Sequence, residues 1–192
     1  MQQFDVSRLS SYVEEHIESF HGPISVYKFP QGQSNPTFRI DGSSNSLVLR
    51  RKPEGVLLKS AHAIDREYRV MLALDKTDVP VPKVYHLCTD DKVIGSWFYL
   101  MEYVDGTVFS GPALPGLTSI QRKHVYDEAN RVLAAIHNVD IKTNALCDFG
   151  STGNYYERQV SRWTKQYRSS ETCVVKPMEQ LMGWLSKNIP ED

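Results

Sequence analysis

The chain has 192 residues, of which 41% are hydrophobic and 23% are charged, and its formal net charge at neutral pH is −1. This composition is typical of a globular protein with one domain or two small lobes. The lack of net positive charge argues against a nucleic-acid partner, and no apolar run reaches the about 20 residues that a transmembrane segment requires. We see no secretory leader, and the 3 cysteines lack metal-ligand spacing, so we expect an intracellular protein with reduced thiols.

The first hundred residues show the pattern of an antiparallel sheet with helices. Asp5 is a suitable N-cap for a first helix, whose apolar side carries Leu9, Val13, Ile17 and Phe20. A second helix is predicted from Ser60 to about Leu74 by its apolar periodicity. Three predicted strands precede this helix and two follow it, at residues 24–29, 37–40, 46–51, 83–88 and 97–103.

After Val104 the pattern changes from strands to helices. Paired glycines and prolines indicate a linker, and Thr118 with Gln121 forms a capping box for a long helix. Two further amphipathic helices are predicted around 156–167 and 178–185, and Pro190 is expected to end the last one. We therefore predict a β-rich lobe with a leading helix over residues 1–104, followed by a linker and a helical part over 105–192.

Glu67 is the most informative charged residue. On the predicted helix, Ile64, Tyr68 and Met71 share one face, and Glu67 falls inside this apolar stripe. A carboxylate that faces a core needs a cation, and Arg50 lies on the preceding strand. We predict an ion pair between Arg50 and Glu67, which would hold the guanidinium where it can meet the phosphates of ATP. The alternative is a partly exposed Glu67 with a partner on a solvated helix face.

Three other segments have weaker signals. The loop at 31–35 contains Ser34 and Asn35, whose side chains and backbone N–H groups suit phosphate oxygens, although any polar hairpin shares this composition. Asp148-Phe149-Gly150 has the sequence of a kinase magnesium motif, but it follows a helix and no catalytic loop precedes it, so we interpret it as a loop. His137 is interpreted as a residue that supports the C-terminal end of a helix dipole.

A resemblance to a known family extends over essentially the whole chain. The segments that carry it, in chain order, are 29–35, 47–53, 60–68, 93–95, 98–106, 133–140 and 155–167. Together they resemble the aminoglycoside phosphotransferase family. Within that family, the chain is most similar to the kinase-like N-terminal domain of acyl-CoA dehydrogenase family members ten and eleven.

This resemblance implies a protein-kinase-like α+β fold. Its N-lobe is a five-stranded antiparallel sheet with one inserted helix, and the first part of a helical C-lobe follows, with ATP bound between the lobes. Arg50 stands where the family has its phosphate-binding basic residue, usually lysine, and Glu67 is its helix partner. The remaining implied nucleotide contacts are Ser34 and Asn35 in the loop over the phosphates, and Glu102 and Val104 in the hinge backbone that faces adenine.

The family's His-Gly-Asp catalytic loop, its downstream Asn and its magnesium-binding Asp have no counterpart in the sequence. We therefore predict no catalytic residue and no metal ligand in this chain, and expect both after Asp192. The implied cofactors are ATP and Mg²⁺, and the implied acceptor is a hydroxyl of a hydroxyacyl-CoA in fatty-acid catabolism. The compartment is cytoplasmic by default, with a mitochondrial or peroxisomal one also compatible with the resemblance. The alternative function is a short form that binds a nucleotide or a protein partner without catalysis.

Overall fold

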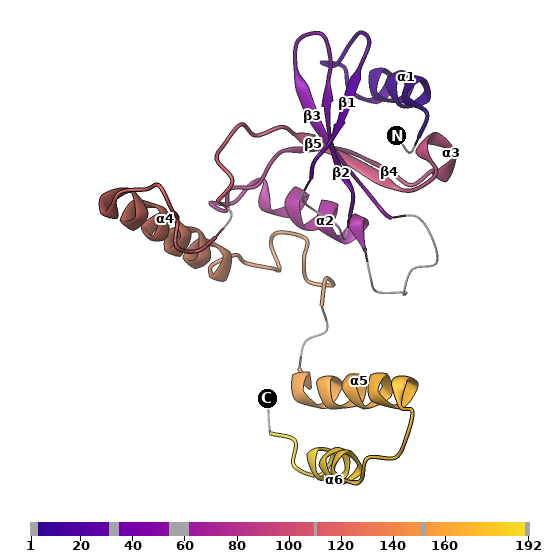
Figure 1. Ribbon diagram of the computed structural model, residues 1–192, viewed down its shortest axis with the longest axis vertical. Helices are drawn as coiled ribbons and strands as arrows, with labels where there is room; N and C mark the ends of the chain where they lie inside the picture. The colour runs from indigo at the N-terminus through magenta and orange to yellow at the C-terminus, as the bar shows by residue number, and fades with distance from the viewer. Residues whose placement is uncertain (1–3, 31–34, 54–61, 110, 151–152, 191–192) are drawn as a thin grey trace. The chain divides into compact units, whose positions relative to one another are not determined.

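The computed structural model describes residues 4–30, 35–53, 62–109, 111–150 and 153–190. The chain divides into two compact units, Met1–Leu146 and Cys147–Asp192, while the predicted lobe boundary between residues 104 and 105 stays a prediction. The elements, in order, are α1 (Val6–His16), β1 (Ser25–Lys28), β2 (Thr37–Asp41), β3 (Ser46–Arg51), α2 (Ile64–Leu74), β4 (Val84–Cys88), α3 (Asp91–Ile94), β5 (Phe98–Glu102), α4 (Ser119–His137), α5 (Tyr155–Ser170) and α6 (Lys176–Leu185) (Figure 1).

The strands form one antiparallel sheet in the order β1-β2-β3-β5-β4, which confirms the five predicted strands. Its register pairs Thr37 of β2 with Arg50 of β3, and Arg50 with Tyr99 of β5. Directly paired residues on neighbouring strands point to the same face of a sheet. Thr37, Arg50 and Tyr99 therefore form a row across three strands on one face.

The opposite face of the sheet is covered by α1. Asp5 caps this helix by accepting two backbone N–H bonds, as predicted. The core on this side also contains apolar residues from four strands. All four residues of the predicted apolar side are buried: Leu9, Val13, Ile17 and Phe20. The helix ends at His16, however, so Phe20 lies beyond it and not on its apolar side.

The face that carries the row is packed against α2. Ile64 of this helix is fully buried against Val84 and Tyr99. The helix begins at Ile64 and not at the predicted Ser60, which lies outside the described residues. The residue two positions before Ile64 is His62, whose φ of 60° lies outside the right-handed helical region. Helical geometry therefore starts only after it.

The helices after the sheet confirm the predicted amphipathic segments. Thr118 and Gln121 form the predicted capping box at the start of α4. In the second unit, α5 and α6 pack together, and an ion pair joins Arg168 to Glu179. The last helix ends at Leu185 rather than at Pro190. Among the described residues, no helix has the length and apolar character needed to span a membrane.

Candidate functional site

Arg50 and Glu67 form the predicted ion pair. The Nε atom of Arg50 lies 2.6 Å from Oε2 of Glu67, and its Nη2 atom lies 3.3 Å from Oε1. The guanidinium thus donates two parallel hydrogen bonds to the carboxylate, and this bidentate arrangement restricts the orientation of both groups. The two side chains remain 27% and 35% exposed, so a ligand can still reach the pair.

The carboxylate of Glu67 faces the sheet, as predicted, and accepts two more hydrogen bonds. The hydroxyl of Tyr99 donates to Oε2 over 3.1 Å, and Nδ2 of Asn35 donates to Oε1 over 2.9 Å. Partial burial by itself would raise the pKa of Glu67. The hydrogen bonds and charge of Arg50, with the bonds from Tyr99 and Asn35, outweigh burial and lower that pKa. Glu67 is therefore ionised at neutral pH.

Arg50 has hydrogen-bonding capacity left for a ligand. In addition to its two bonds to Glu67, its Nη1 atom donates to Oγ1 of Thr37 over 3.1 Å. The bond to Glu67 is the main reason why the pKa of Arg50 is raised. A guanidinium carries five N–H groups, and three of them make these bonds. Within the described residues, no hydrogen bond is seen for the other two, which could donate to anionic oxygen atoms.

Of the two residues predicted to contact phosphate from the loop, Ser34 and Asn35, the structure describes only the second. Ser34 lies outside the described residues. Asn35 is only 3% exposed, and its Oδ1 atom lies 2.8 Å from Nδ1 of His62 while its Nδ2 atom bonds to Glu67. Both ends of the amide are therefore engaged inside the protein. A contact of Asn35 with phosphate would have to use its backbone N–H group, and this predicted role stays a prediction.

The two hinge residues lie at the end of β5 and just beyond it. The backbone N–H of Glu102 donates to the C=O of Lys83 over 2.8 Å, and the carboxylate of Glu102 accepts the N–H of Lys83 over 3.2 Å. The side chain of Glu102 thus fixes the edge between β4 and β5. Val104 is 62% exposed. The predicted contact of these two residues with adenine stays a prediction.

Sequence reasoning missed several neighbours of the ion pair. Thr37 and Tyr99 lie next to Arg50 because the sheet register pairs both of them with it. The alternation of side chains along the strand of Arg50 was the signal that neighbouring strands would place residues beside it. On the same face, the guanidinium of Arg39 lies 4.3 Å from the ring centre of Tyr103 and donates to its hydroxyl over 3.2 Å. This second cation therefore lies beside the residue that joins Glu102 to Val104.

The described residues contain no group of three or more His, Cys, Asp or Glu side chains that could hold a metal ion. Asp148-Phe149-Gly150 forms turns and bends before α5, which confirms the interpretation as a loop. His137 is the last residue of α4, as predicted.

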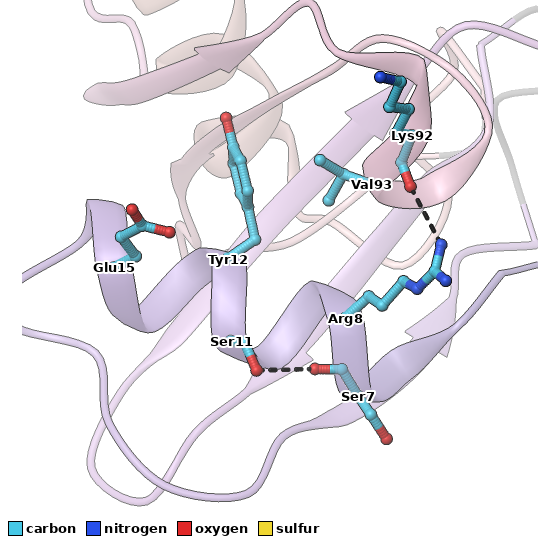
Figure 2. Close-up of a pocket in the computed structure, with 7 residues that line it drawn as sticks. All are labelled: Ser7, Arg8, Ser11, Tyr12, Glu15, Lys92 and Val93. Carbon is cyan, nitrogen blue, oxygen red and sulfur yellow. Dashed lines mark hydrogen bonds between the residues drawn. The ribbon is translucent and has the colours of Figure 1, made fainter.

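A groove of about 530 Å³ lies between α1 and α3. Figure 2 shows that its lining combines serine hydroxyls with Tyr12, Glu15 and Lys92, and that Arg8 donates a hydrogen bond to the backbone C=O of Lys92. Because α1 packs on the sheet face opposite to Arg50, this groove is separate from the ion pair. The candidate site is therefore the network around Arg50 and Glu67.

Comparisons with known proteins show which family the chain belongs to. Residues 25–192 match the family described as "Phosphotransferase enzyme family". The chain is 49% identical over 169 residues to acyl-CoA dehydrogenase family member 10 of Mus musculus, covering 88% of the chain and 16% of that protein. It is 38% identical over 194 residues to acyl-CoA dehydrogenase family member 11 of Homo sapiens, covering 99% of the chain and 25% of that protein. The chain thus spans a quarter or less of these relatives.

A crystal structure from Ralstonia eutropha JMP134, of a protein assigned as an aminoglycoside phosphotransferase, matches with a TM-score of 0.78 and 48% sequence identity. The match covers 98% of this chain and 55% of that one. It confirms the predicted α+β fold of the protein-kinase-like class, and the family match confirms the predicted resemblance.

Proposed function

Since the chain belongs to the phosphotransferase enzyme family, we propose that it carries the nucleotide site of an ATP-dependent small-molecule phosphotransferase. The observation that supports this proposal is the bidentate pair of Arg50 and Glu67. A phosphoryl-transfer site needs a fixed cation for the phosphates of ATP. Glu67 holds the guanidinium of Arg50 in place, and we propose that the remaining N–H groups of this cation donate to phosphate oxygen atoms.

The nature of the cation has consequences for binding. An arginine keeps its charge at all physiological pH values and presents a planar fork, whereas lysine presents a compact ammonium group with rotatable donors. The proposed contact is therefore a directional one between Arg50 and two oxygen atoms of the α- and β-phosphates. Backbone groups of Glu102 and Val104 are proposed to bind the adenine edge, and the loop with Ser34 and Asn35 to cover the phosphates.

The described residues contain no group of three or more His, Cys, Asp or Glu side chains that could hold a metal ion, and we propose that the protein supplies no ligand to magnesium. An ion that enters with ATP would then be bound by phosphate oxygens and water. We expect the chain to bind ATP with a Kd that magnesium changes by less than about threefold. Calorimetric titration of ATP with and without magnesium measures this ratio. Submicromolar binding that requires magnesium would contradict it, and a chain that binds no ATP would overturn the proposed nucleotide site.

We propose a hydroxyl of a hydroxyacyl-CoA as the acceptor, in the context of fatty-acid catabolism. Support comes from the names of the relatives, which are acyl-CoA dehydrogenase family members. The test incubates a full-length protein that contains this sequence with labelled ATP, hydroxyacyl-CoA compounds and aminoglycosides. Label on a hydroxyacyl-CoA supports the proposal, and label on aminoglycosides alone overturns it.

The second candidate is nucleotide or protein-partner binding without catalysis. ATP binding without label on any acceptor supports this candidate against the first.

A further inference from the structure

His62 occupies an unusual position next to the candidate site. Its φ of 60° lies in the left-handed region, where side chains with a Cβ atom are strained and where, apart from Gly, the residues Asn, Asp and His are found most often. It lies two residues before the start of α2, the helix that carries Glu67. Its Nδ1 atom is 2.8 Å from Oδ1 of Asn35, the residue two positions before β2. The strained backbone thus coincides with a specific side-chain contact.

The direction of each hydrogen bond in this chain of contacts follows from its last member. The carboxylate of Glu67 is ionised and can only accept, so Asn35 must turn its NH₂ group toward it. The carbonyl oxygen of Asn35 then faces His62 and can only accept. Nδ1 of His62 must therefore carry a proton. Each donor in the series is matched to one acceptor, from His62 through Asn35 to Glu67.

We propose that His62 is a positioning residue of the nucleotide site, which holds Glu67 toward Arg50 through Asn35 and thereby raises the affinity for the phosphates of ATP. The inference rests on the proposed function, because ATP is the ligand.

The physical reason is the burial of Asn35, which is only 3% exposed. Without His62, its amide oxygen would be buried without this partner, and a buried polar atom that loses its hydrogen bond is costly. The amide would turn to find water or another donor. Its NH₂ group would then leave Oε1 of Glu67, the oxygen atom that also accepts from Nη2 of Arg50. The guanidinium would lose part of the constraint that fixes it for phosphate.

Two substitutions of His62 distinguish the effect of its backbone conformation from the effect of its side-chain hydrogen bond. Glycine adopts a φ of 60° without strain but offers no donor, whereas asparagine tolerates the same backbone and keeps an N–H donor close to the position of Nδ1. We expect His62→Gly to raise the Kd for ATP about five- to tenfold, and His62→Asn to change it less than about twofold. The Kd for adenosine, which has no phosphates, should stay the same in both variants.

The measurement is calorimetric titration of ATP and of adenosine into the wild-type chain and both variants, after circular dichroism has verified their folding. A wild-type chain that binds no ATP overturns the proposed function together with this inference. ATP binding by the wild type that His62→Gly leaves unchanged overturns the inference alone. An equal loss of ATP and adenosine affinity also overturns it, because a purely structural role of His62 would have that effect. Weakened ATP binding in His62→Gly with wild-type-like binding in His62→Asn supports it.

Discussion

Replacement of Arg50 by alanine is expected to raise the Kd for ATP about 100-fold, because it removes two charge-assisted hydrogen bonds to phosphate. Glu67 keeps its bonds from Tyr99 and Asn35 in this variant, so the sheet and α2 should remain joined. Adenosine should bind the variant as it binds the wild type, since Arg50 is proposed to contact only the phosphates. Calorimetric titration of both ligands into the two proteins measures the effect.

Two control variants sharpen this experiment. Arg50→Lys keeps the charge but loses the planar fork, so we expect a smaller loss, about tenfold. Arg8→Ala removes an arginine from the groove between α1 and α3, on the opposite face of the sheet, and should leave the Kd for ATP unchanged. If Arg50→Ala binds ATP as tightly as the wild type, the phosphates do not contact Arg50 and the proposed site is wrong.

The sequence was sufficient to predict the centre of this site. Glu67 falls in the apolar stripe of α2, and a charge in that position requires a partner. Arg50 was the cation on the strand just before the helix, and the structure confirms the pair. The prediction succeeded because it joined two constraints, the helical periodicity of Glu67 and the cost of an unpaired buried charge.

The neighbours of the pair depend on information that local sequence does not hold. Tyr99 reaches Glu67 only because β5 lies beside β3, and this strand order is a property of the whole sheet. Asn35 was expected to face phosphate because it lies in a polar loop, yet its amide is buried between His62 and Glu67. The partners of a loop side chain are set by packing between segments far apart in the chain.

Two differences between the predicted and the observed elements have local causes. The start of α2 was placed too early because Ser60 is a good cap in composition, whereas the left-handed backbone of His62 delays the helix. The short helix α3 was not predicted, although Asp90 caps it and Gly95, with a φ of 81°, ends it. A single turn carries too little apolar periodicity to be recognised, so only its two end signals were available.

Glu67→Ala is expected to lower the free energy of unfolding by about 2 kcal/mol at neutral pH, because Arg50, Tyr99 and Asn35 all lose their acceptor. Fully buried hydrogen bonds to a charged group would contribute more in total. The Glu67 side chain is 35% exposed, however, and solvent screening reduces the contribution of these hydrogen bonds to the free energy of unfolding. Chemical denaturation of the wild type and the variant measures the difference. Glu128→Ala, which breaks an exposed pair with Arg131 in α4, is the matched control and should have a much smaller effect.

The pH dependence of this difference shows whether it arises from charge. The pKa of Glu67 is lower in the folded protein than its ordinary value, so folding favours the ionised carboxylate. Its contribution to stability is complete above the ordinary pKa of about 4.3 and is lost as the pH falls through the lower, folded value. The gap in unfolding free energy between wild type and Glu67→Ala should therefore be largest near neutral pH and shrink in acid. A gap that stays constant with pH would mean that Glu67 acts through packing, and the ionised pair would then have no part in holding Arg50 for a phosphate.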